Sequence, residues 1–228
     1  MDMPEPPPPH PRTRAPGQWE AVCRDLQQAI ILGQLKPRER LVEDEVIARI
    51  GATRHAVRRA LAELERLGLV IRQPNRGVQV RDYTLTEIEE LYEIRACLER
   101  QAAMRFRFPV PPALIDELRA IATAHAAASS ARHFADIFAL NNRFHETLYG
   151  AAGSAALAEA IRRYTFATHP IRSRAFPSDE LREVAIHDHF AMIDALVAAD
   201  SAALAALIAT HIRRPMQFYI AQTFITPR

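Results

Sequence analysis

Residues 51–80, GATRHAVRRALAELERLGLVIRQPNRGVQV, constrain the fold more than any other stretch of this chain. The first half has helical periodicity over residues 54–67, and Thr53 directly before it is a natural N-cap. The second half holds two short β-prone runs, 69–72 and 78–81, around the turn sequence QPNRG. The stretch therefore predicts one helix followed at once by a β-hairpin.

The predicted helix has two distinct faces. At about 100° per residue, its apolar side chains fall in one sector and its cationic side chains in the other. The apolar sector comprises Ala56, Val57, Ala60, Leu61, Leu64 and Leu67, and the cationic sector comprises Arg54, His55, Arg58, Arg59 and Arg66. One face suits a core and the other an anionic partner, although any amphipathic surface helix can carry arginines.

The residues before this helix complete a known arrangement. Apolar positions recur at helical spacing from Trp19 to Gly33, and a second, short helix is expected over residues 43–50. A helix that follows a short helix and a tight turn can place the side chains of its N-terminal half in a DNA major groove. Arg54 and Arg58, four residues apart, would project together from its first turns.

Further arginines could contact the DNA backbone. Arg76, at the tip of the hairpin, could enter the minor groove or meet a phosphate, and Arg38, Arg40 and Arg49 could add phosphate contacts. Residues 1–83 carry 14 Lys or Arg against 11 Asp or Glu, whereas the whole chain has a net charge of only +2. The basic excess therefore lies in the N-terminal part.

After Tyr83 the pattern is helical throughout. Six helices are expected, over residues 86–107, 111–128, 132–149, 154–174, 179–198 and 201–222. A capping box formed by Thr86 and Glu89 would begin the first helix, and Pro170 and Pro215 should kink or shorten two others.

These patterns predict a mainly α protein. A winged helix-turn-helix domain is expected over residues 17–83, and an all-helical bundle of six or seven helices over residues 84–228. The proline-rich residues 1–16 are expected to form an extended tail.

The sequence has no pattern typical of an exported or membrane-spanning protein. No apolar run approaches the roughly 18–20 residues that span a bilayer, and the N-terminus has no signal-peptide pattern. Cys23 and Cys97 lie far apart without a CxxC motif, so two buried thiols in a reducing compartment are expected. We therefore expect a cytoplasmic protein.

The segment LVEDEVIARIGATRHAVRRALAELERLGLVIRQPNRGVQV resembles the DNA-binding domain of the GntR family of bacterial transcription regulators. The family pattern L-x-E-x-x-L-A, S-R-x-P-V-R-x-A-L, G-L-V and R-G-x-x-V is kept with its spacing over about 40 residues. The resemblance implies that Arg54 and Arg58 read the operator, that Thr53 replaces the usual capping serine and that Gly77 is the wing-tip glycine. His55 and Arg59 depart from the usual groove-facing set, as Ala56 departs from a common proline, so the operator sequence does not follow from the family.

Four residues of the second part could meet in the interior of the bundle. Asn141 and His145 are four residues apart and share a helix face. His189 and His211 each stand eleven residues from Asp200, so they lie at similar heights on successive antiparallel helices. Three imidazoles and an amide oxygen suit a divalent ion such as zinc or nickel, completed by water or a ligand oxygen.

Residues 86–222 also resemble the FCD domain, the helical ligand-binding domain of the FadR-like branch of the GntR family. There a D-x-x-F-H motif and one histidine on each of the last two helices bind a metal, which maps onto Asn141 to His145, His189 and His211. Asn141 replaces the acidic residue, and a neutral amide leaves more of the ion's charge uncompensated. The remaining histidines, His10, His125, His133, His169 and His187, are assigned to packing or the surface.

Arg95 is the expected effector contact. Leu91, Ile94 and Leu98 form an apolar stripe beside it, and the resemblance places this arginine in the pocket, where it would pair with a carboxylate ligand. The alternative is a surface pair with Glu99, four residues on. Arg143 and Arg172 are further candidates for the same pocket.

The combined prediction is a homodimeric transcription regulator, more specifically a repressor, that binds a palindromic site in double-stranded DNA and responds to a small carboxylate. One alternative is a metal-responsive regulator in which the ion is the signal. Another is a metal-dependent hydrolase, which is disfavoured because the sequence has no HExxH motif and no general base beside the histidines.

Overall fold

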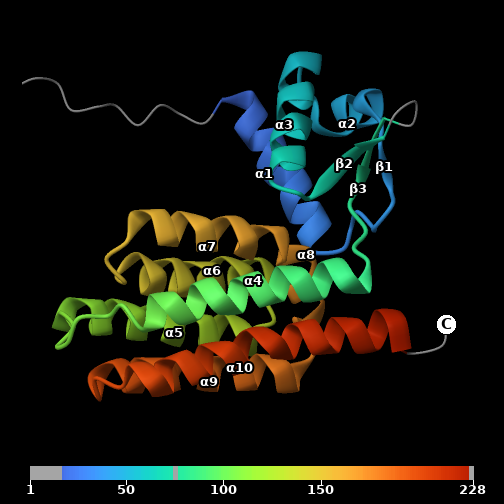
Figure 1. Cartoon of the computed structure of the whole chain (residues 1–228). Helices are drawn as coiled ribbons and strands as arrows, with labels where there is room; N and C mark the ends of the chain where they lie inside the picture. The colour runs from blue at the N-terminus through green and yellow to red at the C-terminus, as the bar shows by residue number, and fades with distance from the viewer. Residues whose placement is uncertain (1–16, 74–76, 226–228) are drawn as a thin grey trace, which may run out of the picture.

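The structure, a computed structural model, describes residues 17–73 and 77–225 (Figure 1). The predicted tail over residues 1–16 and the hairpin-tip residues 74–76 lie outside this range. The N-terminal elements are α1 (Gln18–Ile31), β1 (Arg40–Leu41), α2 (Glu43–Ile50), α3 (Arg54–Arg66), β2 (Val70–Gln73) and β3 (Gly77–Val80).

The predicted helix-turn-helix and hairpin are present with nearly the predicted bounds. Gly51 ends α2 with φ 69°, a left-handed conformation that glycine adopts at little cost. The Thr53 hydroxyl then accepts a hydrogen bond from the Ala56 amide and caps α3. The antiparallel sheet has the order β1-β3-β2, with Arg72 opposite Val78. Strand β1 was not predicted, because two residues are too few for a periodic signal.

The N-terminal core lies between α1, α3 and the sheet. The apolar face of α3 supplies Val57, Leu61 and Leu64, all fully buried, and Leu26 of α1 packs in the same cluster. Each such side chain contributes roughly 1.5–3 kcal/mol by leaving water. Burial of this face therefore fixes which side of α3 remains exposed.

The remaining elements are helical. They are α4 (Leu85–Ala103), α5 (Pro112–Ser130), α6 (Phe134–Gly150), α7 (Ala155–Ala167), α8 (His169–Arg172), η1 (Ser173–Ala175), α9 (Asp179–Val197), α10 (Ser201–Ile220) and η2 (Ala221–Ile225). Their main core includes Leu118, Phe144, Leu148, Met192 and Ile193. The predicted mainly α fold, with a winged helix-turn-helix and a helical bundle, is confirmed. Among the described helices, none has the length and apolarity needed to cross a membrane.

Two local predictions for the bundle have different outcomes. The capping box is formed by Thr84 and Glu87, not by Thr86 and Glu89, because the Glu87 carboxylate accepts a hydrogen bond from the Thr84 amide at 2.9 Å. The helix predicted over residues 154–174 is shortened, as expected from Pro170: α7 ends at Ala167, and Pro170 lies in the separate short helix α8.

The expectations for Pro215 and for the two cysteines are met only in part. Pro215 lies inside α10, which continues to Ile220 rather than ending there. Cys23 is buried as expected, whereas Cys97 is exposed on α4.

The two parts of the chain touch through α1 and the α7–η1 segment, and Figure 1 shows the N-terminal elements over α8 and the start of α4. The Tyr83 hydroxyl lies 2.7 Å from the Ala167 carbonyl oxygen and 3.0 Å from that of Gly68. The Ser173 hydroxyl donates a hydrogen bond to the Ile31 carbonyl at the end of α1. A shift of η1 would therefore act directly on the C-terminal end of α1 through this hydrogen bond.

Candidate functional site

The cationic face of α3 is exposed and partly neutralised by α2. Arg54 donates to Asp44 at 2.7 Å, and Arg58 donates to Glu43 at 2.8 Å. The two arginine side chains remain 55% and 62% exposed, respectively, and His55 between them is exposed as well. Exposed ion pairs contribute only roughly 0.2–1 kcal/mol, so phosphates or base edges can compete for these guanidinium groups.

The other predicted DNA contacts surround this face. The Arg59 guanidinium stacks over the Trp19 ring of α1, 4.1 Å from its centroid. This contact makes Arg59 less available for DNA than Arg54 and Arg58. Arg38 pairs with Asp82 at 2.6 Å, and Arg49 lies 3.7 Å from the carboxylate of Asp25.

The remaining candidates lie at the start of α3 and on the hairpin. Thr53 is held by Gln18, whose side-chain oxygen accepts its hydroxyl at 3.0 Å. Gly77 begins β3 with φ 77°, as a wing-tip glycine would, and Arg40 is exposed on β1. Arg76 lies outside the described residues.

Three histidines meet in the bundle interior. His145 of α6, His189 of α9 and His211 of α10 are buried, or nearly so, and bring one ring nitrogen each within 4.8 Å of one another. The Nε2 atoms of His145 and His211 are 3.1 Å apart. Sequence spacing predicted similar heights for His189 and His211 on successive helices, and the structure brings His145 to them as well.

Asp188 is a residue that the sequence reasoning missed. Its carboxylate is buried and lies 3.1 Å from His211 Nδ1, and it also accepts a hydrogen bond from Arg214. A proton on Nδ1 leaves His211 Nε2 with its lone pair toward the other two imidazoles. The only signal in the sequence was an acid directly before His189.

Burial keeps the imidazoles of His145 and His189 neutral. The pKa values of His145 and His189 lie well below the usual value of 6.5. The main cause is loss of solvation, and the second is the nearby His211. A neutral imidazole is the form that binds a metal ion. His145 and His189 are therefore in the protonation state in which they can act as metal ligands.

These residues fit a divalent ion. Zinc–nitrogen distances of about 2.0–2.1 Å place tetrahedral ligand nitrogens roughly 3.3 Å apart, which small side-chain shifts would reach from the arrangement here. Within the described residues, neither ring nitrogen of His189 has a hydrogen-bond partner. Asn141, one turn before His145, is also buried, and its Nδ2 atom has no partner in that part of the chain.

A cavity of about 50 Å³ adjoins the histidines. Its lining includes Asn141, Arg172, Asp188 and His211. Burial and the charge of Arg95 lower the pKa of Arg172 to about 10, so its guanidinium is still charged at neutral pH. Arg172 donates to Asn142 through Nη2, while its Nε has no partner among the described residues.

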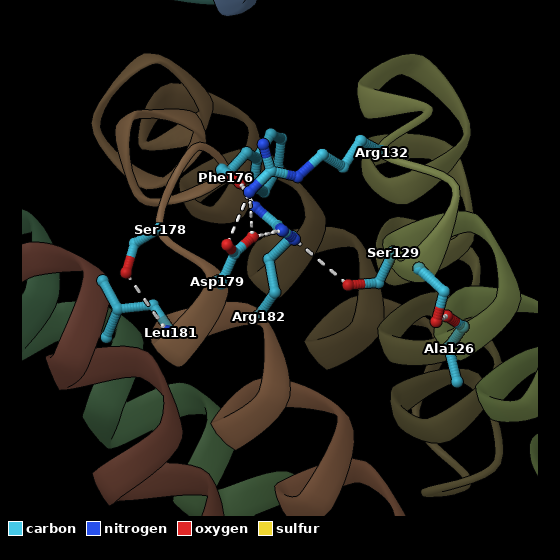
Figure 2. Close-up of polar contacts among 9 residues, drawn as sticks. Ala126, Ser129, Arg132, Phe176, Ser178, Asp179, Leu181 and Arg182 are labelled. Carbon is cyan, nitrogen blue, oxygen red and sulfur yellow. Dashed lines mark hydrogen bonds and ion pairs between the residues drawn. The ribbon is translucent and has the colours of Figure 1, made fainter.

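Arg182 closes one side of this cavity. Figure 2 shows its guanidinium between Ser129, the Phe176 carbonyl and Asp179, which also pairs with Arg132. These contacts use all three nitrogens of Arg182, so this residue is a structural part of the wall. Arg172 is therefore the lining arginine with a buried nitrogen, Nε, that has no hydrogen-bond partner among the described residues.

Arg95 does not lie where it was expected. Its side chain is buried and bound to Glu99 at 2.8 Å and to Thr168 at 2.9 Å. The alternative expectation was a pair with Glu99 at the surface. The pair is present but buried, because this face of α4 points inward, while Ile94 is 40% exposed. The guanidinium already has an internal carboxylate and does not line the cavity.

Arg143 is another correction. Its side chain is 63% exposed and reaches toward Glu117 at 3.5 Å, away from the cavity lining.

The other histidines follow the packing assignment. His125 and His169 are buried, with His169 packed against Phe138 and Phe166, and His133 and His187 are exposed.

Comparisons with known proteins place the chain in a family. Residues 18–80 match the model of bacterial regulatory proteins of the gntR family, and residues 90–214 match the FCD domain model. The chain belongs to the GntR family of transcription regulators. The expectation of a regulator rather than an enzyme is confirmed, because family members and relatives are HTH-type transcription regulators.

Relatives of this GntR regulator cover most of its length. An uncharacterised HTH-type regulator from the TAR-I ttuE-ttuC' intergenic region of Agrobacterium vitis is 31% identical over 60% of the chain and 81% of its own length. The HTH-type transcriptional repressor RspR of Escherichia coli is 23% identical over 85% of each chain.

Solved structures show the same fold. McbR/YncC of E. coli superposes with a TM-score of 0.74 at 20% identity, covering 91% of this chain and 99% of its own. A GntR regulator from Rhodococcus sp. RHA1 also gives 0.74, at 22% identity, covering 90% of this chain and 98% of its own.

Proposed function

We propose that this GntR regulator is a homodimeric repressor that reads a palindromic operator with Arg54 and Arg58 and is released by a small carboxylate. The observation that carries the DNA-reading part is the geometry of α3, whose buried face is fixed by the core while both arginines stand exposed on its first turns. The relative RspR is named as a repressor, which supports the direction of control.

The proposed effector site is the cavity beside the histidines. A carboxylate there could accept from Arg172 Nε and Asn141 Nδ2, which have no partner in the described part of the chain, and the cavity of about 50 Å³ has room for such a group. His145, His189 and His211 would hold a divalent ion, which when bound supplies positive charge that attracts an anionic oxygen. Asp188 would orient His211.

The proposed link to DNA runs through adjacent residues. Arg172 lines the cavity, and Ser173 next to it is hydrogen-bonded to the Ile31 carbonyl of α1. A carboxylate that draws Arg172 toward the cavity would move η1, and α1 carries α3 through their shared core. Control requires that the effector bind the DNA-competent and DNA-incompetent arrangements with different affinities.

Selection of bound sequences from random DNA, followed by gel shifts on the selected operator, tests the DNA-reading part. We expect Arg54→Ala and Arg58→Ala each to weaken specific binding by roughly 1–3 kcal/mol per lost base contact. Arg66→Ala is the matched control, because Arg66 is exposed at the other end of the same helix. Unchanged operator affinity in both variants would remove Arg54 and Arg58 from the reading set.

A second candidate is a metal-responsive regulator, favoured by the three converging imidazoles. Gel shifts of metal-stripped protein, with zinc or nickel alone and with carboxylates alone, separate the two functions. Release of the operator by metal in the absence of any carboxylate would favour this second function.

A further inference from the structure

A second cavity, of about 580 Å³, opens on the other side of α6. It is lined by α6, α7 and the start of α8, and it shares no lining residue with the smaller cavity that contains Asn141 and Arg172. Cavities of this size are typical of small-molecule sites. The smaller cavity has room for only a few atoms.

Three buried polar atoms without a hydrogen-bond partner belong to residues of this lining. They are His145 Nδ1, Thr165 Oγ1 and His169 Nδ1, and the statement holds for the described part of the chain. Buried polar atoms are normally paired, so a molecule bound in this cavity could supply the missing partners.

His145 connects this cavity to the histidine cluster. Its Nε2 lies 3.1 Å from His211 Nε2, the residue also lines the second cavity, and its Nδ1 has no hydrogen-bond partner among the described residues. A metal-binding histidine normally donates its other ring N–H to an oxygen, as His211 does to Asp188. If Nε2 instead donates to His211, Nδ1 becomes an acceptor. A hydroxyl group satisfies both states because it donates and accepts, whereas a carboxylate only accepts.

The charge of the lining disfavours an anion. Glu146 and Glu159 line the cavity, and the one arginine in the lining, Arg162, is bound to Glu159 at 2.7 Å. The formal charge of these three residues is therefore −1. Phe166 and Tyr149 add aromatic surface of the kind that packs against the C–H faces of a sugar.

We propose that the cavity between α6 and α7 binds an uncharged, polyhydroxylated small molecule of monosaccharide size, with His145, Thr165 and His169 as its polar contacts. The role of His145 in both states of the cluster rests on the proposed metal site, whereas the cavity and the other two contacts do not. Occupation of this cavity would fix the orientation of the His145 ring and so adjust the neighbouring histidine cluster.

Calorimetric titration of the full chain with uncharged monosaccharides and polyols, each beside its aldonic or uronic acid, tests the proposal. We expect saturable one-to-one binding of at least one uncharged compound, with its acid at least about tenfold weaker. Ala158→Leu, which fills the cavity, should abolish binding, while Ala156→Leu on the exposed side of α7 should not. Thr165→Val should weaken binding roughly tenfold, and Thr210→Val on exposed α10 surface should leave it unchanged.

Repeating the titration on chelator-treated protein separates this proposal from the proposed function. Binding that persists without metal and is lost in Ala158→Leu supports the second cavity even if metal analysis shows no ion. If no uncharged compound binds saturably, or if binding survives Ala158→Leu, the proposal is overturned, whatever the carboxylates do at the Arg172 cavity.

Discussion

His145 and His211 differ in what lies on the far side of each ring. His211 is held by the buried carboxylate of Asp188, and Asp188 is in turn held by Arg214. His145 has no such partner within the described residues. The rigidity of the proposed metal site therefore depends on Asp188, although this residue is not among the proposed ligands.

Replacement of Asp188 tests this dependence. Asp188→Asn keeps the shape but weakens the hydrogen bond that fixes the His211 ring, so we expect zinc affinity to fall roughly 10–100-fold. Competition with a fluorescent chelator measures the affinity. Asp194→Asn, on the exposed side of α9, is the matched control. Equal zinc affinities for Asp188→Asn and the unmodified chain would show that the carboxylate does not orient the ligand set.

At the scale of elements, local patterns predicted the structure where an element depends on its own residues. Helix α3, its Thr53 cap and the hairpin follow from periodicity and turn chemistry within 30 residues. The same patterns failed for α4, where Arg95 and Glu99 are buried because Thr168 and Tyr149, more than 45 residues away in sequence, supply their hydrogen bonds. Helix spacing predicted the similar heights of His189 and His211, whereas the positions of Asp188 and of the cavity lining depend on contacts between helices.

The contact between η1 and α1 allows an element-scale prediction. Ser173→Ala removes the hydrogen bond to the Ile31 carbonyl but leaves Arg172 and the histidines in place. We expect carboxylate binding, measured by calorimetry, to be unchanged. In the unmodified chain the carboxylate should change operator affinity by roughly 5–150-fold, and in Ser173→Ala this change should nearly disappear. Ser130→Ala, at the exposed end of α5, is the control. If the carboxylate changes the operator affinity of Ser173→Ala as much as that of the unmodified chain, the Ser173–Ile31 hydrogen bond does not transmit the signal.

At the scale of the whole molecule, buried neutral histidines link stability to pH. Burial lowers the pKa of His125 to about 4 and holds that of His169 well below 6.5, and the same direction applies to His145 and His189. Below a pH of about 6.5 the unfolded chain takes up protons that the folded chain cannot. The stability that these groups contribute is therefore present above pH 6.5 and is lost as the pH falls toward their folded-state pKa values.

His169 isolates one part of this effect because it lies outside the three-histidine cluster, packed between Phe138 and Phe166. For each such histidine we expect the free energy of unfolding to fall by at most about 1.4 kcal/mol per pH unit between pH 6 and 5. Urea unfolding of metal-stripped protein should therefore show a shallower pH slope for His169→Phe than for the unmodified chain. His187→Gln, which removes an exposed imidazole from α9, should keep the original slope. Parallel slopes for all three proteins would mean that His169 takes up its proton in the folded state, and its burial would then have no part in the acid sensitivity of the regulator.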